Sequence, residues 1–285
     1  MPDYGHPLRF GSFITPVNVP VHRAADLAVL SEDFGLDLVT FQDHPYQPAF
    51  HDTWTLLTWV AARTATITVA PNVLNLPLRP PSVVARAAAS LSLLTGGRFA
   101  LGIGAGGFNE AAHAFGAPMR TAGQSVTALD EALDIIRGIW DVDAPGILRV
   151  HGEHYQVDGA KRGPRLPQRI PIWLGAYKPR MLRLVGTKGD GWLPSLAWME
   201  SGALGAGNRL IDAAAREAGR DPRQIERLLN VPPDTSADLL VRAAIAGVST
   251  FIVATDDPDE LRRFAQRTVP EVRERVASAR AGSTS

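Results

Sequence analysis

The chain has 285 residues, of which 45% are hydrophobic and 20% are charged, and its 29 basic and 29 acidic side chains cancel. It has no cysteine, which excludes disulfides, thiolate metal sites and cysteine nucleophiles, and the zero net charge argues against nucleic acid as the main partner. The first residues lack the basic start and apolar run of a signal peptide, and no apolar stretch reaches the ~18 residues of a membrane span. We therefore expect a cytoplasmic enzyme that acts on a small molecule, with no nucleic-acid or membrane partner.

Strand-like and helical patterns alternate along the first half of the chain. Short runs of β-branched, aromatic and other apolar residues predict strands, and apolar residues at helical spacing predict the helices between them. The predicted strands are 9–16, 36–44, 67–74 and 98–106, and the helices that follow them are 21–35, 52–65, 81–97 and 124–140. Asp52 stands where it would cap the second helix.

The alternation breaks at about 141–169 and then returns. The break is rich in proline, glycine and charge, and it contains a hairpin pattern at 148–157. Further strands are predicted at 170–176, 190–195, 224–233 and 249–255, followed by helices at 178–189, 208–219, 236–247 and 258–276.

Eight strand–helix pairs predict an α/β fold of the (β/α)8 TIM barrel type, formed by a single domain over residues 1–285. A doubly wound open sheet uses the same alternation, so the count of eight carries this prediction. Because the alternation resumes after 141–169, we interpret that segment as an insertion after the fourth helix rather than as a domain boundary. Together with the loop at 196–207, it is expected to shape the substrate pocket.

The run LGIGAGGFNE at 101–110 contains the spacing G-x-G-x-x-G at Gly102, Gly104 and Gly107. In a dinucleotide-binding fold this pattern usually lies in the first strand–helix unit and leads straight into a helix. Here it follows the fourth strand and leads into a short turn and a loop, so we reject that interpretation. Two others stay open: the glycines let the strand end in a tight turn, or they let a flat ligand lie against the backbone.

The strand ends carry the candidate functional residues, because active sites of parallel barrels occupy the face where all strands end. Asp43 and His44 end the second strand, and histidine exchanges a proton near neutral pH, so this pair is the candidate for catalysis. Asn72 and Asn75 interrupt the third strand, which predicts a bulge that faces a ligand. Arg79 lies beyond them, where either a bound anion or a surface carboxylate would satisfy it.

The fifth and sixth strand ends add a second group of candidates. Gly175 and Ala176 are small and Lys178 precedes a predicted helix, which is the outline of a phosphate site. Asp190 and Trp192 either reach the same mouth or, for Asp190, serve as the structural partner of a helix end. The sequence contains no metal-ligand motif and no G-x-S-x-G nucleophile.

Taken together, these segments resemble the bacterial luciferase-like flavin and deazaflavin oxidoreductases. The resemblance covers almost the whole chain and rests on FQDHP, PNVLNLPLRPPSVVARAAASLSLLTGGRFALGIGAGGFNE, IPIWLGA and GTKGDGWLP in that order. The long central block is its specific part. The resemblance implies a (β/α)8 barrel with an insertion region and a cofactor, coenzyme F420 or FMN, at the C-terminal mouth.

The resemblance also implies a role for each matching residue. Asp43 and His44 match the acidic–histidine pair beside the reactive ring of the cofactor. Asn72 and Val73 match a bulge that often holds a non-proline cis peptide bond behind that ring. The remaining matches are contacts to the cofactor at Asn75, Ala105, Gly106 and Asn109, and a phosphate-binding turn at Gly175, Ala176 and Lys178.

The implied reaction is hydride transfer between F420, or FMN, and a small organic substrate, with His44 handling a proton near the reactive ring atom. An aspartate before the histidine favours F420 over FMN. Sugar-phosphate dehydrogenases of this family have a catalytic glutamate where this chain has Gly107, and Glu110 is near but not equivalent. That departure puts sugar-phosphate activity in doubt and leaves the substrate open.

Three alternatives to this function remain. With reduced FMN and O2, the same site would be that of a monooxygenase. From a different class, Asp43, His44 and His113 would be the residues of a metal-dependent barrel hydrolase. A non-catalytic relative would keep the site for binding a flavin only. Relatives are often dimers, so a homodimer is a further expectation.

Overall fold

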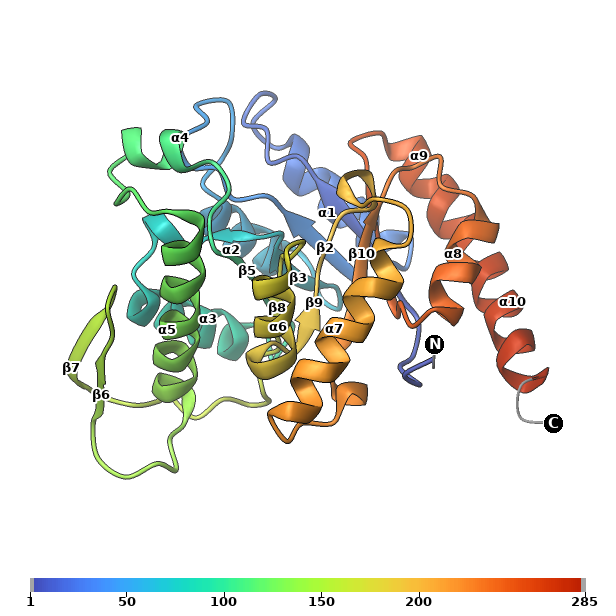
Figure 1. The fold of residues 1–285 in the computed structure, drawn as a ribbon. Helices are drawn as coiled ribbons and strands as arrows, with labels where there is room; N and C mark the ends of the chain where they lie inside the picture. The colour runs from blue at the N-terminus through green and yellow to red at the C-terminus, as the bar shows by residue number, and fades with distance from the viewer. Residues whose placement is uncertain (1–2, 283–285) are drawn as a thin grey trace.

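Nine short parallel strands form the barrel of this computed structural model, which describes residues 3–282 (Figure 1). Neighbouring strands follow the order β3-β2-β1-β11-β10-β9-β8-β5-β4. The strands are β1 Arg9–Ile14, β2 Leu38–Phe41, β3 Thr68–Pro71, β4 Leu74–Asn75, β5 Leu101–Gly104, β8 Ile172–Leu174, β9 Gly191–Trp192, β10 Glu226–Val231 and β11 Thr250–Ala254.

The third strand position consists of two short strands, β3 and β4. They stand at the two ends of the strand order, so the barrel closes where they meet. β3 pairs with β2, whereas β4 pairs with β5. Val69 of β3 also meets the residues before β5: its N–H donates to the Arg98 carbonyl at 3.0 Å, and its carbonyl accepts from Ala100 at 3.2 Å. With β3 and β4 counted as one position, the described residues form the (β/α)8 barrel that the sequence predicts.

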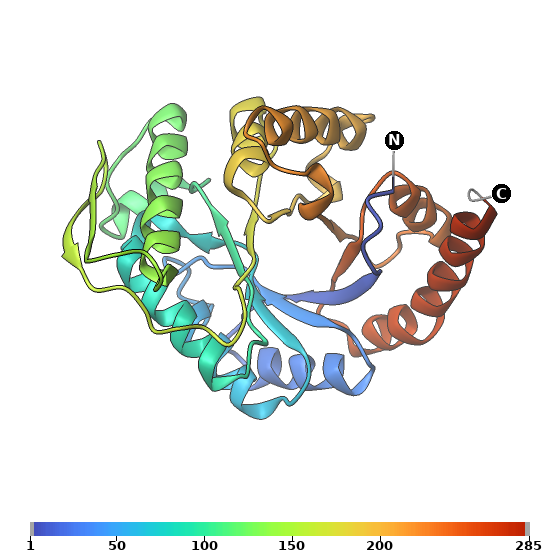
Figure 2. The same cartoon turned by 90° about the horizontal axis from the view of Figure 1, so that it is seen from below.

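Helices surround the strands in chain order (Figure 2). They are α1 Arg23–Asp33, α2 Thr53–Arg63, α3 Pro81–Leu94, α4 Asn109–Ala114, α5 Ala122–Trp140, α6 Pro179–Lys188, α7 Ala203–Glu217, α8 Ala237–Ile245, α9 Pro258–Arg263 and α10 Val269–Gly282. Single 3-10 turns lie at Leu76–Leu78, Leu196–Trp198 and Pro222–Gln224, and a π-helical turn at Phe264–Thr268 joins α9 to α10. Asp52 caps α2 as predicted, since its carboxylate accepts from the Thr55 N–H at 2.9 Å.

Both faces of the strands are buried, as near-continuous apolar strands require. The barrel interior is filled by one cluster, and a larger cluster lies between the strands and the helices. The interior cluster contains Leu38, Ala70, Ala100, Trp173, Leu193, Leu228 and Ile252, with Phe13 and Val73 packed against it. This packing holds the strand ends, and therefore the candidate site, on a rigid frame.

The segment at 141–169 contains the predicted hairpin, formed by β6 Leu148–His151 and β7 Gln156–Ala160. It follows the end of α5, and Figure 1 shows it at the bottom left, whereas α4 lies at the top. The turn of the hairpin folds back along α5, where Glu131 accepts from the Tyr155 N–H at 3.0 Å and Arg120 lies over the Tyr155 ring. The role of this segment in shaping the substrate pocket stays a prediction.

Candidate active site

Asp43 follows β2 and is held by three hydrogen bonds. One carboxylate oxygen accepts from the Asn75 N–H at 2.9 Å and from Arg79 Nε at 2.8 Å, and the other accepts from Arg79 Nη2 at 2.8 Å. The Asp43 side chain is fully buried. A buried carboxylate held in this way positions the chain around it, so we interpret Asp43 as a positioning residue rather than as a proton carrier.

Arg79 forms ion pairs with two carboxylates. Of the two partners expected for it, a bound anion or a carboxylate of the protein, the structure shows the second. Besides Asp43, it reaches Asp52 Oδ2 at 2.6 Å, and Asp52 in turn caps α2. Burial alone would lower the pKa of the Arg79 guanidinium, but the hydrogen bonds and charges of the two carboxylates outweigh burial and raise it. Arg79 therefore ties the loop after β2 to the start of α2 and to the third strand position.

His44 is half-buried next to Asp43 and lies among aromatic rings. Its Nδ1 is 2.6 Å from the Tyr46 hydroxyl, and its ring meets Phe108 edge to face at a centroid distance of 5.2 Å. Burial lowers the pKa of His44, and the charge of Asp43 opposes this only in part. The imidazole is therefore neutral near pH 7, and within residues 3–282 nothing hydrogen-bonds its Nε2.

The third strand position contains the expected cis peptide bond between Asn72 and Val73. The Asn72 amide is hydrogen-bonded within the protein. It donates to Asn230 Oδ1 at 2.7 Å and to the Thr40 hydroxyl at 3.1 Å, and Asn230 donates back at 3.2 Å. Asn72 therefore contributes its backbone to the site, while its side chain is paired across the barrel.

Val73 and the glycines at the ends of two neighbouring strands form a flat floor. A Cβ added to Gly104 would lie 2.8 Å from Val73 Cγ2, and one added to Gly175 would lie 3.3 Å from the same atom. Gly106 has a φ of +94°, and a Cβ there would lie 2.6 Å from Pro77. Gly104 and Gly106 leave no room for a side chain, and one at Gly175 would be tight; the small side chain of Ala105 continues the floor.

Two asparagines flank this floor. Asn75 is buried, and its Oδ1 is a buried oxygen with no hydrogen-bond partner, so a donor from a bound ring would satisfy it. Asn109 instead donates from Nδ2 to the Arg120 carbonyl at 3.2 Å, which holds the loop after α4. The structure thus leaves the Asn75 oxygen without a hydrogen-bond partner and gives Asn109 a partner within the protein.

The predicted phosphate turn lies where two helices begin. Lys178 is the residue before α6, and Arg180 of α6 donates to the Gly123 carbonyl in the first turn of α5 at 2.8 Å. Ala176 is buried and accepts from the Trp192 indole at 2.8 Å. Exposed N–H groups at the start of α6 and a neighbouring cation suit an anion.

Asp190 and Trp192 do not reach the mouth. Trp192 is 1% exposed and packs on Gly207 of α7. Asp190 lies at the start of β9, where it accepts from Arg137 at 2.8 Å and from Arg169 at 2.6 Å. Of the two alternatives for Asp190, the structure supports a structural role, because its carboxylate binds arginine side chains at the start of the strand.

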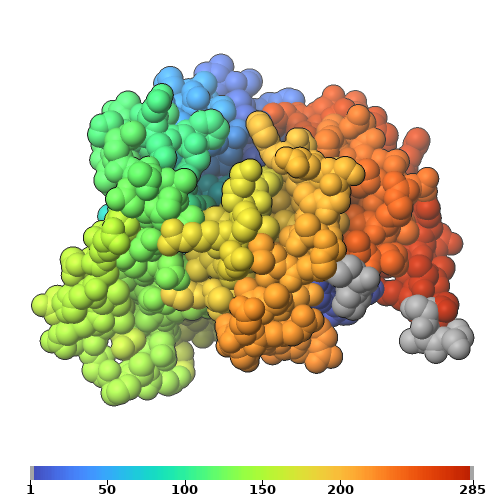
Figure 3. Space-filling model, in the orientation of Figure 1, coloured from blue at the N-terminus to red at the C-terminus, as the bar shows by residue number. Residues whose placement is uncertain are grey.

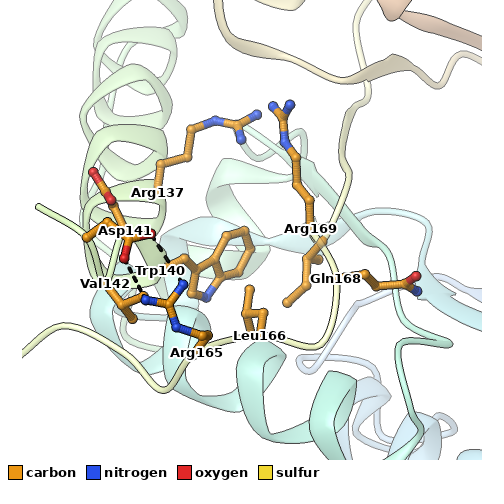
Figure 4. Close-up of a pocket in the computed structure, with 10 residues that line it drawn as sticks. Arg137, Trp140, Asp141, Val142, Arg165, Leu166, Gln168 and Arg169 are labelled. Atoms are coloured by element: carbon orange, nitrogen blue, oxygen red, sulfur yellow. Dashed lines mark hydrogen bonds and ion pairs between the residues drawn. The ribbon is translucent and has the colours of Figure 1, made fainter.

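A cavity of about 320 Å³ adjoins these arginines (Figure 4). Trp140, Leu166 and Ile170 contribute to its wall, and it lies beside the end of α5 rather than at the strand ends. None of the residues predicted for catalysis or cofactor binding lines it. In the space-filling view the mouth is instead the hollow between the region of α4 and the segment after β9 (Figure 3).

The hydrolase hypothesis gains no support from the arrangement of its residues. Among the residues that the structure describes, no group of three or more His, Cys, Asp and Glu side chains could hold a metal ion. His113 Nδ1 bonds to the Ala117 carbonyl at 2.9 Å, and the Asp43 carboxylate is paired with Arg79.

The described helices include none with the length and hydropathy needed to cross a bilayer.

Sequence reasoning missed Tyr46, Phe108 and Asn230. Tyr46 lies two residues beyond His44, so proximity along the chain was an available signal. Asn230 lies on β10, and its pairing with Asn72 spans 158 positions. No local sequence pattern predicts a contact between residues so far apart in the chain.

Replacing Gly104 with alanine is expected to lower the free energy of unfolding by about 1–3 kcal/mol, because the new methyl group displaces Val73. It should also weaken binding of any flat ligand at the floor. Urea unfolding measures the first effect. Gly107→Ala is the matched control, since a Cβ there meets nothing within 4 Å. Equal losses in the two variants would contradict the assignment of the floor.

The structure defines a TIM barrel that carries the candidate site at the C-terminal ends of its strands. The chain belongs to the luciferase-like monooxygenase family, whose model matches residues 8–282.

Two curated relatives and one solved structure illustrate this membership. An F420-dependent glucose-6-phosphate dehydrogenase of Kineococcus radiotolerans is 31% identical, covering 92% of this chain and 80% of the relative. A 5,10-methylenetetrahydromethanopterin reductase of Archaeoglobus fulgidus is 32% identical, covering 95% and 79%. An F420-dependent secondary alcohol dehydrogenase, solved with an F420–acetone adduct, shares the fold with a TM-score of 0.82 and 17% identity, covering 94% and 99%.

Proposed function

We propose that this protein is an oxidoreductase that transfers a hydride between coenzyme F420 and a small organic substrate. The observation that carries the proposal is the buried, unpartnered Oδ1 of Asn75, which flanks the flat floor of Val73 and Gly104. The half-buried, neutral imidazole of His44 stands on the neighbouring strand end. Two curated relatives named for F420-using or reductase activities support it.

The residues present fit a deazaflavin ring with a phosphate-bearing tail. Val73, Ala105 and Gly106 would lie against the ring, and Asn75 would accept a hydrogen bond from it. The tail would reach the turn at Gly175 and Ala176, where Lys178 and the start of α6 favour negative charge. F420, when bound, supplies a ring carbon that gives up or accepts a hydride.

The protein's own side chains orient the substrate and stabilise charge. His44 is placed to hydrogen-bond the substrate oxygen, while Asp43 and Arg79 hold the loop that carries it. Phe108 stands edge to face against His44 and covers one side of the imidazole. Catalysis in such a site comes from orientation and from a hydrogen bond aimed at developing charge.

The second candidate is an FMN-dependent monooxygenase, which the description of the matching family model favours. It would use the same floor, and its substrate would meet reduced flavin and O2 at His44. For either function, sugar phosphate is not the proposed substrate class, because Gly107 stands where the sugar-phosphate enzymes of the resemblance carry a catalytic glutamate.

Titration of the protein with F420 and with FMN, followed by absorbance and fluorescence, tests this proposal. We expect F420 to bind with a Kd below about 100 μM, which is roughly −5.5 kcal/mol. Asn75→Ala and Lys178→Ala should each weaken binding about tenfold, as the loss of one hydrogen bond or charge contact does.

Lys161→Ala is the control, since Lys161 is an exposed residue that directly follows β7 and is none of the predicted site residues. Failure of both cofactors to bind the parent protein below that limit would overturn the proposal. Preferential binding of FMN would favour the second candidate.

A further inference from the structure

Tyr46 is bonded to the imidazole that the proposed function places beside the substrate. Its hydroxyl oxygen is 2.6 Å from His44 Nδ1, and the two rings are tilted by 54° with centroids 5.5 Å apart. The Phe108 ring contacts both of them. A contact this short between a phenol and an imidazole nitrogen is a strong hydrogen bond, so one of the two groups must donate.

The surroundings decide which group donates. Burial raises the pKa of the Tyr46 phenol, and the charge of Asp43 raises it further, so the phenol keeps its hydrogen near pH 7. The Asn75 side chain lowers the pKa of the phenol and so opposes these two effects. The one phenol hydrogen is then directed at His44 Nδ1, because the structure gives Tyr46 no other acceptor among the described residues.

We propose that Tyr46 is a positioning residue that fixes neutral His44 with its hydrogen on Nε2, so that an uncharged N–H meets the substrate oxygen. The role of His44 rests on the proposed function, whereas its tautomer does not. A neutral imidazole suits this task because its N–H can donate a hydrogen bond to the negative charge that develops on the substrate oxygen.

The reaction balances as follows in the direction of reduction. A bound, reduced cofactor would supply the hydride: the C–H bond on its reactive ring carbon would break, a C–H bond to the carbonyl carbon of the substrate would form, and the electron pair of the C–O π bond would move onto oxygen. His44 Nε2–H donates a hydrogen bond to that oxygen, which then takes a proton from water. The two electrons leave the cofactor, which is oxidised, and the carbonyl is reduced to an alcohol.

The test is ¹⁵N NMR of the cofactor-free protein labelled at histidine, with the His44 signals assigned from His44→Gln. We expect a pyridine-type Nδ1 and a pyrrole-type Nε2 at neutral pH. In Tyr46→Phe the ring contact with Phe108 is kept but the donor is lost, so both His44 nitrogens should move toward intermediate shifts. Tyr4→Phe, whose hydroxyl bonds to Asp212 of α7 and not to His44, is the control and should leave them unchanged.

A kinetic measurement separates positioning from packing. With a substrate in hand, Tyr46→Phe should lower kcat about 10–100-fold, the usual cost of losing a supporting hydrogen bond, with KM little changed. A pyrrole-type Nδ1 in the parent protein, or unchanged His44 signals in Tyr46→Phe, would overturn the inference even if F420 binds. The predicted tautomer in a protein that binds no cofactor would instead support the inference and defeat the proposed function.

Discussion

Replacing His44 with glutamine is expected to reduce turnover by about 10²–10⁴-fold while leaving F420 affinity nearly unchanged. The imidazole is the titratable group beside the floor that has an unbonded nitrogen, and burial keeps it neutral near pH 7. Glutamine can still fill part of the space but cannot present the same N–H in the same place. The measurement is F420 absorbance during turnover of a panel of small alcohols, aldehydes, enones and imines, next to a binding titration of the same variant.

His151→Gln is the control for this experiment, because His151 lies exposed in the β6–β7 hairpin. Its turnover should match that of the parent protein. If His44→Gln keeps full turnover, the imidazole does not contact the reacting atoms. If the variant loses cofactor binding to the same degree as turnover, His44 belongs to the binding surface instead.

Replacing Arg79 with methionine should lower the free energy of unfolding by about 3–5 kcal/mol, the effect of leaving a buried carboxylate without its partner. Asp43 is fully buried, and Arg79 supplies two of its three hydrogen bonds. Methionine keeps the apolar stem of the arginine but removes the fork that binds the carboxylate. Urea unfolding of the parent and variant proteins measures the difference.

Two further variants make this result interpretable. Arg149→Met removes an exposed ion pair with Asp158 and should cost less than about 1 kcal/mol. Asp43→Asn combined with Arg79→Met removes the uncompensated charge, so the double variant should be less destabilised than the sum of the single variants. If Arg79→Met costs no more than Arg149→Met, the buried pair does not hold the site together.

The prediction of the fold succeeded because it rested on a repeated pattern. Each strand is buried on both faces, and each helix has one buried side, so apolar residues recur at the spacing of each element. The ends of elements were less well predicted. The strand predicted at 190–195 is only Gly191–Trp192, and the helix predicted at 208–219 begins at Ala203, because hydrogen bonding with neighbouring strands and helices sets these limits.

At the mouth of the barrel, too, some features were predicted from the sequence and others were not. His44 and Asn75 were placed at the mouth because all parallel strands end on one face, which follows from the order of elements alone. The different roles of Asp43 and His44 could not be read in the same way. Asp43 is engaged because Arg79, 36 positions away, folds back onto it, and that return is a tertiary contact.

The sequence by itself determined that this protein is a TIM barrel of the luciferase-like family, because hydrophobic periodicity and motif order are properties of the chain; it also predicted that the chemistry lies at the strand ends. Tertiary structure alone decided which polar side chains are satisfied and which are free. Asn72 pairs with Asn230 across the barrel, whereas the Asn75 oxygen is buried without a hydrogen-bond partner.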